Sequence, residues 1–255
     1  MRLLSLCVLC CLPLQSLWAQ SLCPVPLRVG FDDWPPYHYY QQEGEHRQLR
    51  GFAIDYLNAV SARLGCRLHY VELPWKRGLH DLELGRLDIL MEAYFSDDRA
   101  RYAWFSIPYN PGRTALWVRK PDTGDEMDLG RWLDRGHRLG VTRDYYYGPD
   151  IAEQLRRYPD RVSAVNDVQN YRKLVLGRID GFLGDSLATS WGLKKEGLSD
   201  KVVPHAMGIY ETPTSFMLSK KTISSEFVQR FNQAIVAVGE SGEHEHIWRR
   251  YTSVR

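Results

Sequence analysis

Apolar and polar positions along the chain predict strands and helices in alternation from about residue 27. Residues 52–64 carry apolar side chains at the three-to-four-residue spacing of a helix, and Gly65 follows as the helix end. Strands are predicted at 27–30, 67–72 and 85–91, the last one preceded by a turn, and a second helix at about 75–84. This order is typical of a parallel sheet covered by helices, so we expect a ligand at the carboxyl ends of the strands.

A second unit begins near residue 120 and repeats this plan. Its predicted elements are a strand at 138–141, a helix from about 148, a helix at 167–176 and a strand after the turn at 178–180. One turn sequence of glycine, basic, apolar and aspartate residues occurs in both units, as Leu84-Gly85-Arg86-Leu87-Asp88 and Leu176-Gly177-Arg178-Ile179-Asp180. The repeated turn predicts two similarly built lobes.

The pattern changes after about residue 208, where a strand at 214–218 precedes two helices with apolar stripes. If this tail packs on the first lobe, the chain crosses between the lobes twice, near 117–120 and 205–209. Two crossings would form a hinge that permits closure and restrains sliding. We therefore expect lobe 1 to contain residues 24–117 and 209–255, and lobe 2 to contain residues 118–208.

Composition supports two domains and argues against one class of partner. The chain has 255 residues, 44% hydrophobic and 25% charged, which is near the upper size of a single hydrophobic core. Its 33 basic and 31 acidic residues are well mixed and give a net charge of +2. Because no basic run or stripe stands out, nucleic acid is not expected as the main partner.

The first 19 residues have the pattern of a cleavable signal peptide. Arg2 supplies the positive start, Leu3 to Leu17 the apolar stretch, and Ala19 a small residue before the cleavage point. The apolar stretch is shorter than the about 20 residues that span a bilayer. We therefore expect residues 1–19 to be removed and the mature protein to be soluble in the periplasm.

Two cysteines remain after the predicted signal peptide, Cys23 and Cys66. Each comes just before a predicted strand, so the thiols can meet if the two strands are neighbours. An even pair in an oxidising compartment favours a disulfide. Two buried free thiols are the alternative.

Several segments, in order along nearly the whole mature chain, resemble the extracellular solute-binding proteins of family 3, the polar amino-acid-type binding proteins of ABC transporters. The matching segments are Trp34-Pro35-Pro36-Tyr37, Gly51-Phe52-Ala53-Ile54-Asp55, Ser96-Asp97-Asp98-Arg99, Phe105-Ser106-Ile107-Pro108-Tyr109, the two repeated turns, and Asp185. The resemblance implies a two-lobed α/β periplasmic binding protein fold of type II, in which each lobe is a mainly parallel sheet flanked by helices. It also implies a monomer that binds a small amino-acid-like ligand, without cofactor or metal, for an inner-membrane ABC permease.

The resemblance implies that two residues bind the two charged groups of the ligand. Arg99 would bind the ligand's carboxylate, for which a planar guanidinium offers paired donors, and Ser96 would cap the helix that holds Arg99. Asp185, at the end of a predicted buried strand, would accept the ligand's ammonium. A zwitterion would then bridge the two lobes and stabilise their closed form. The alternatives are an ion pair of Arg99 with Asp97 or Asp98, and a helix-capping role for Asp185.

Aromatic residues at the family's strand-end and loop positions would form the walls of the ligand site, with ordinary packing as the alternative. They are Trp34, Tyr37, Trp75, Tyr94 and Tyr109. The Trp75-Lys76-Arg77 segment resembles an element that opens a helix at the cleft in one branch of the family, which adds Arg77 to the expected site.

The chain departs from the family pattern in two places. Where family members carry glycine and a small hydroxyl residue, this chain has Asp144, Tyr145 and Tyr146, and Glu92 stands where a small residue is common. We count Tyr145 and Glu92 among the expected site residues. Either the ligand is not a plain α-amino acid, or these side chains point away from it, so the ligand's identity stays open.

Two other functions are alternatives to transport binding. A few proteins of this fold are dehydratases, in which a residue such as Glu92 would donate a proton. A soluble receptor that presents its closed form to a membrane sensor is the second alternative. The histidines at 244 and 246 are two residues apart and do not share a helix face, so no metal site is expected. Binding without chemistry is the function that we expect.

Overall fold

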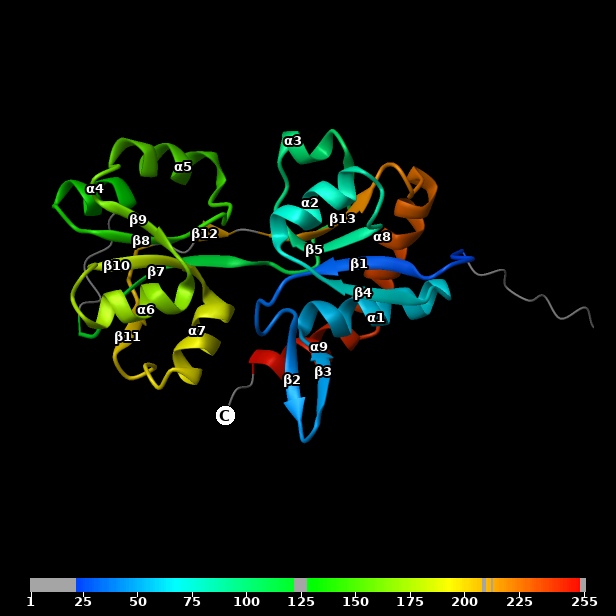
Figure 1. The fold of residues 1–255 in the computed structure, drawn as a ribbon, viewed down its shortest axis with the longest axis horizontal. Helices are drawn as coiled ribbons and strands as arrows, with labels where there is room; N and C mark the ends of the chain where they lie inside the picture. The colour runs from blue at the N-terminus through cyan, green and yellow to red at the C-terminus, as the bar shows by residue number, and fades with distance from the viewer. Residues whose placement is uncertain (1–21, 122–127, 208–209, 212, 253–255) are drawn as a thin grey trace, which may run out of the picture.

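The computed structural model describes residues 22–121, 128–207, 210–211 and 213–252. The predicted signal peptide lies outside these residues. The described chain forms two α/β units side by side along the long axis, each built on its own sheet (Figure 1). Together the two sheets and their covering helices establish the α/β class that the alternating pattern predicted.

The first unit contains a five-stranded sheet in the order β4-β1-β5-β13-β6. Strand β1 pairs in parallel with β4 and β5, whereas β13 runs antiparallel to β5 and β6. Its strands are β1 (Leu27–Phe31), β4 (Leu68–Glu72), β5 (Ile89–Ala93), β6 (Ala103–Phe105) and β13 (Ser215–Ser219). Its helices are α1 (Phe52–Leu64), α2 (Trp75–Glu83), α3 (Asp97–Ala100), α8 (Ser225–Glu240) and α9 (Glu243–Thr252).

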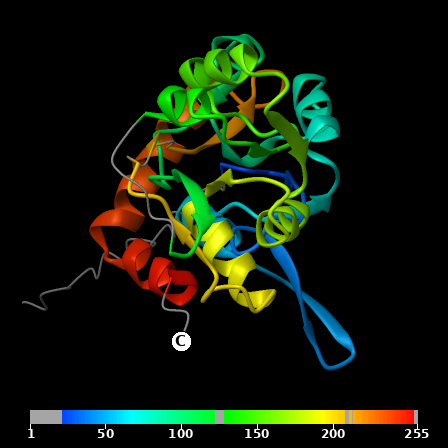
Figure 2. The same ribbon diagram turned by 90° about the vertical axis from the view of Figure 1, so that its left-hand side faces the viewer.

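Apolar side chains of α1, α8 and α9 form one core on this sheet, and Leu82 of α2 belongs to a second core with Leu90 and Met217. Helix α1 ends as predicted, because Gly65 adopts a left-handed conformation with φ 66°. A hairpin of β2 (Tyr39–Glu43) and β3 (His46–Arg50) projects away from the unit (Figure 2). The projecting hairpin adds no strand to the sheet.

The second unit contains a six-stranded sheet in the order β11-β7-β10-β8-β9, with β12 beside β7. Strands β10, β8 and β9 are parallel, and β7 is antiparallel to β10, β11 and β12. The strands are β7 (Arg113–Arg119), β8 (Leu139–Thr142), β9 (Val162–Val165), β10 (Gly181–Asp185), β11 (Val202–Pro204) and β12 (Tyr210–Glu211). The helices are α4 (Leu129–Asp134), α5 (Gly148–Arg157), α6 (Asp167–Val175) and α7 (Ser186–Lys195).

The chain leaves the first sheet earlier than the predicted crossing at 117–120. All of β7 lies in the second sheet, where residues 114–118 pair with β10, although the prediction placed residues up to 117 in lobe 1. The reason is the burial of β7 on both faces, which suits a central strand of that sheet. A bridge joins Asn110 to Thr214 where the two crossing segments run side by side. We place the exchange points between the lobes at these two residues.

The predicted disulfide between Cys23 and Cys66 is present, with the two Cα atoms 5.1 Å apart. It forms because β1 and β4 are parallel neighbours in register, with Leu27 opposite Leu68. The bridge therefore joins the starts of an edge strand and its neighbour.

The repeated turn forms the same ionic contact in both units. The side chain of Arg28 donates to both oxygens of Asp88 at 2.7 and 2.9 Å and to the Gly85 carbonyl at 2.8 Å. Arg138 makes the same contacts with Asp180, at 3.0 and 3.1 Å, and with the Gly177 carbonyl, at 2.7 Å. The aspartate of each turn thus holds the arginine that begins the central parallel strand.

Replacing Asp88 by alanine is expected to lower the free energy of unfolding by about 1.5–3 kcal/mol, the worth of hydrogen bonds to charged groups. The Asp88 side chain is 8% exposed, and its loss leaves the Arg28 guanidinium without its carboxylate. Urea denaturation measures the change. Asp98→Ala is the control, because the Asp98 side chain is 82% exposed and its loss should cost less than about 0.5 kcal/mol. Equal midpoints for the two variants would contradict the structural role of the turn.

Candidate ligand-binding cavity

A cavity of about 250 Å³ lies between the two units, at the carboxyl ends of their parallel strands. The first unit contributes residues that follow β1, open α2, or lie at and after the end of β5. The second unit contributes residues that follow β8 and β9. The lining residues are Asp32, Asp33, Trp34, His38, Trp75, Met91, Glu92, Tyr94, Arg99, Thr142, Arg143, Asp144, Tyr145, Tyr146, Asn166 and Asp167. Both walls therefore come from strand ends, as expected for sheets of this kind.

Arg99 lies on the short helix α3, which Ser96 caps through a hydrogen bond from the Arg99 backbone nitrogen to its hydroxyl, 3.4 Å long. The guanidinium donates to the Tyr94 carbonyl at 2.9 Å, and its central carbon lies 5.5 and 5.6 Å from the ring centroids of Trp75 and Tyr146. Burial lowers the pKa of this guanidinium. The two rings shield the charge of Arg99 from water and hold the side chain at the cavity.

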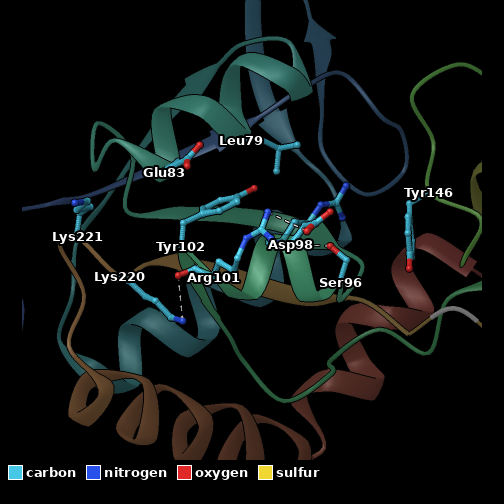
Figure 3. Close-up of a pocket in the computed structure, with 10 residues that line it drawn as sticks. Leu79, Glu83, Ser96, Asp98, Arg101, Tyr102, Tyr146, Lys220 and Lys221 are labelled. Atoms are coloured by element: carbon cyan, nitrogen blue, oxygen red, sulfur yellow. Dashed lines mark hydrogen bonds and ion pairs between the residues drawn. The ribbon is translucent and has the colours of Figure 1, made fainter. Parts of the chain in front are cut away.

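The alternative ion pair of Arg99 is not formed within the described part of the chain. Asp98 instead pairs with Arg101 at 2.9 Å. Figure 3 shows this pair at a larger, open hollow of about 860 Å³ beside α3, with Tyr146 on the far side. Ser96 and Arg99 also line this hollow, so Arg99 borders both the cavity between the units and the hollow beside α3.

Aromatic rings from both units meet at the cavity. The ring centroids of Trp34 and Tyr145 are 6.0 Å apart, and those of Tyr94 and Tyr146 are also 6.0 Å apart. The hydroxyls of Tyr94 and Tyr145 are hydrogen-bonded to each other. Ring faces from the two units can therefore hold an apolar or cationic part of a guest on both sides.

The cavity is acidic. Five of its lining residues are aspartate or glutamate, against the two arginines Arg99 and Arg143. Asp144 forms an ion pair with Lys76 across the two units at 2.9 Å. Burial lowers the pKa of His38, so this ring adds little positive charge. Since Asp144 is paired and burial raises the pKa of Glu92 to about 7, Asp32, Asp33 and Asp167 are the carboxylates that a positively charged group could balance.

Glu92, at the floor of the cavity, is bound by both crossing segments. Its carboxylate accepts hydrogen bonds from Tyr109 at 2.6 Å, Asn110 at 2.7 Å and Thr214 at 2.6 Å. Burial raises its pKa to about 7, although the three donors act in the opposite direction. The backbone at Glu92 is in the left-handed region, with φ 51°. The residue thus ties the two segments that join the units.

Stability should depend on pH through Glu92. The native state binds its proton more tightly than the unfolded chain, whose glutamate pKa is 4.5. Its stabilising contribution is therefore complete below about pH 4.5 and is lost as pH rises through about 7. At 1.36 kcal/mol per pKa unit, the loss is about 3 kcal/mol. Urea unfolding at pH 5 and pH 8 should show this fall in the wild type and a smaller fall in Glu92→Gln; equal falls would contradict it.

Asp185 ends β10 and caps α7, as the helix-capping alternative predicted. One carboxylate oxygen accepts hydrogen bonds from the Ala188 backbone nitrogen at 2.8 Å and from the Tyr37 hydroxyl of the first unit at 3.0 Å. Burial raises the pKa of this carboxyl to about 6. Asp185 does not belong to the residues that line the cavity. Its contact with a ligand ammonium stays a prediction.

The cavity brings together six of the ten expected ligand residues, namely Trp34, Trp75, Glu92, Tyr94, Arg99 and Tyr145. Tyr37 and Asp185 do not line it and are hydrogen-bonded to each other. Arg77 points to solvent and lies 3.5 Å from Asp81, and Ser96 acts as a helix cap. Tyr109, also expected as a wall, is buried against Tyr56 and Phe216.

Sequence reasoning missed several lining residues, among them Asp32, Asp33, Thr142 and Asp167. Each lies at or just after the end of a parallel strand, which is the signal that could have found them. Asp167 accepts a hydrogen bond from the Thr142 hydroxyl, and burial raises the pKa of its carboxyl. The acidic character of the site comes largely from these missed residues.

The chain belongs to the bacterial extracellular solute-binding proteins, family 3, whose family model matches residues 27–254. It is similar to the arginine-binding periplasmic protein of Mannheimia haemolytica, with 24% identity over 86% of this chain and 87% of that protein. It is also similar to the L-cystine-binding protein TcyJ of Escherichia coli K12, with 25% identity over 85% of this chain and 78% of that protein.

Solved structures share the fold. An ancestral arginine-binding protein bound to arginine has a TM-score of 0.71 and 21% identity, with 89% of this chain and 98% of that chain covered. A histidine kinase sensor domain with similarity to periplasmic binding proteins has a TM-score of 0.73 and 21% identity, with 89% and 96% covered. The predicted two-lobed binding-protein fold is thereby confirmed.

Among the helices that the structure describes, none has the length and apolar character needed to cross a bilayer. The same residues contain no cluster of three or more histidine, cysteine, aspartate or glutamate side chains placed to hold a metal ion.

Proposed function

We propose that this protein is a periplasmic receptor that encloses a small amino-acid-like ligand between its two lobes and delivers it to an ABC permease. The cavity lined by both units is the observation that supports this function most strongly. A guest that contacts both walls stabilises the closed arrangement over the open one, because only the closed form offers both sets of contacts. The closed form is then the signal that a permease recognises.

Arg99 would bind the carboxylate of the ligand. Its faces are covered by Trp75 and Tyr146, and one of its five N–H groups donates to Tyr94. The remaining N–H groups are available for paired hydrogen bonds to a carboxylate, in surroundings that exclude much of the competing water.

The excess of carboxylates favours a ligand with a cationic side chain. After the ligand's carboxylate is placed on Arg99, Asp32 and Asp33 remain near Trp34 on the wall of the cavity. A guanidinium or ammonium group held against an aromatic face and beside carboxylates gains both charge and ring contacts. The similarity to the arginine-binding periplasmic protein of Mannheimia haemolytica supports the same class.

A thermal-shift series tests this function. L-Arginine and L-lysine are expected to raise the unfolding temperature, since a ligand at 100 times its Kd adds about 2.7 kcal/mol to stability. L-Glutamate is the matched comparison, because it keeps the amino-acid group and reverses the charge of the side chain. A larger shift with L-glutamate would contradict the cationic class, and no shift with any amino acid would contradict the receptor.

The site needs no second chain, because one chain supplies both walls, and we propose that the receptor acts as a monomer. We also propose that the ligand leaves unchanged. The carboxylate of Glu92 already accepts three hydrogen bonds from residues of the protein, which favours a structural role over proton donation. Recovery of an altered ligand after incubation would overturn the second proposal.

A receptor for a membrane sensor is the second candidate, because a histidine kinase sensor domain shares this fold. Ligand closure would work in the same way, and the partner would differ. Co-purification from membranes with a permease supports delivery, whereas co-purification with a kinase supports sensing.

A further inference from the structure

One oxygen of the buried Asp185 carboxylate accepts hydrogen bonds from both lobes. The Ala188 backbone nitrogen donates to it from its own helix, and the Tyr37 hydroxyl donates to the same oxygen from the other lobe. Asp185 is 4% exposed and Tyr37 is 1% exposed. Tyr37 therefore donates, from the first lobe, to the carboxylate that the resemblance assigned to the ligand's ammonium.

Two further tyrosines line the cavity, one from each lobe. Tyr94 and Tyr145 line the cavity, and their hydroxyls are hydrogen-bonded to each other across the lobes. Burial and the nearby Asp185 carboxylate raise the pKa of the Tyr94 hydroxyl, and burial, Tyr94 and Asp185 raise that of Tyr145. Asp185 is not among the residues that line the cavity. A guest in the cavity would therefore contact Tyr94 and Tyr145, whereas Asp185 lies outside the lining.

We propose that this receptor recognises its ligand through the carboxylate and the distal cation, without a contact between Asp185 and an α-ammonium, and that Tyr37 is the residue that determines this specificity. The inference rests on the proposed function, since it assumes that the cavity binds a cationic amino-acid-like molecule. It extends the ligand class to ω-guanidino and ω-amino acids that lack the α-amino group.

The quantity to measure is the ratio of the affinities for an α-amino acid and for the matching ligand that lacks the α-amino group. A site that held the α-ammonium on a buried carboxylate would bind a des-amino ligand about 10- to 150-fold more weakly, the ratio that corresponds to the net worth of a charge-assisted hydrogen bond. A site that does not contact the α-ammonium should bind the two ligands with affinities within about threefold of each other. Loss of the carboxylate, in contrast, should weaken binding at least about tenfold, because Arg99 loses its partner.

Titration calorimetry with two matched pairs tests the wild type. The pairs are L-arginine with 5-guanidinopentanoate, and L-lysine with 6-aminohexanoate, and agmatine serves as the ligand without a carboxylate. Affinities within about threefold in each pair support the inference. A preference of tenfold or more for the α-amino acids overturns it while the proposed function stands. Absence of binding by all five compounds overturns the cationic receptor and the inference together.

Tyr37→Phe tests the residue, because it removes the hydroxyl and leaves the Asp185 acceptor without that donor. The variant is expected to prefer L-arginine over 5-guanidinopentanoate by about tenfold. Tyr56→Phe is the matched control, since its hydroxyl donates to the Ile235 carbonyl within the first lobe, and its ratio should stay that of the wild type. An unchanged ratio in Tyr37→Phe overturns the assignment.

If Tyr37→Phe does not fold, Asp185→Asn decides the question. The ratio of the affinities for L-arginine and 5-guanidinopentanoate should stay within about threefold of the wild-type ratio, because the ligand does not contact this carboxylate. Loss of an existing preference for the α-amino acids in Asp185→Asn overturns the proposal.

Discussion

Replacing Arg99 by alanine is expected to weaken the binding of L-arginine about 100-fold or more. The variant loses paired charge-assisted hydrogen bonds to the ligand's carboxylate, each worth about 1.5–3 kcal/mol. It also leaves that carboxylate in a cavity whose other charged groups are mostly acidic. Titration calorimetry measures the ratio directly. Arg99→Lys should recover part of the loss, since it restores the charge without the planar pair of donors.

Arg101→Ala is the control for this change, because Arg101 lies two residues further on, its side chain is 77% exposed, and it pairs with Asp98 outside the cavity. It should bind L-arginine within about twofold of the wild type. Equal affinities of Arg99→Ala and the wild type would show that the ligand's carboxylate lies elsewhere. Equal losses in both variants would point to a general effect of positive charge.

Removing the disulfide by the double replacement Cys23→Ser and Cys66→Ser is expected to lower the free energy of unfolding by about 4 kcal/mol. The bridge joins residues 43 apart in sequence, and a loop of this length restricts the unfolded chain by that amount on chain-entropy grounds. Because native domains are stable by only about 5–15 kcal/mol, the loss is a large fraction of the total. Urea denaturation of the oxidised wild type and the double variant measures it.

Ligand affinity provides the control for the disulfide, since neither cysteine lines the cavity. At a temperature where both proteins are folded, the double variant should bind L-arginine within about twofold of the wild type. Reduction of the wild type with a thiol should move its unfolding midpoint to that of the variant. Coincident midpoints of the oxidised wild type and the variant would contradict the stabilising role of the bridge.

The sequence pattern predicted those elements that depend only on residues close to them in the chain. The periodicity of residues 52–64 and the glycine after them gave both ends of α1, because a helix ends where a left-handed residue is available. The disulfide could be predicted because each cysteine precedes a strand and the strands of adjacent parallel segments pair. The repeated turn was visible in sequence, whereas its ionic contact was not, since Arg28 and Asp88 are 60 residues apart.

The crossing between lobes was harder to predict. Strand β7 is a continuous apolar run, and such a run fits a central strand of either sheet equally well. Its place is decided by pairing with β10, about 67 residues further on. Hydrophobic pattern alone contains no information on that choice.

The site could be predicted only in part, because some of its contacts also depend on residues far apart in the chain. Arg99 and the tryptophans could be found from motifs, and six expected residues do line one cavity. The bond between Tyr37 and Asp185 could not be predicted, because it joins residues 148 apart on different lobes and depends on how the lobes meet. The carboxylates at 32 and 33 look like ordinary loop residues in sequence, and only the convergence of strand ends gives them a shared environment.

A crystal structure of the protein with L-arginine tests the central claim most directly, namely that the cavity between the lobes encloses the ligand. The ligand is expected between Trp34 and Trp75, with its carboxylate within hydrogen-bond distance of the Arg99 guanidinium and with contacts from residues after β8 in the second unit. A ligand bound outside this cavity, or held by one unit alone with Arg99 turned to solvent, would contradict it.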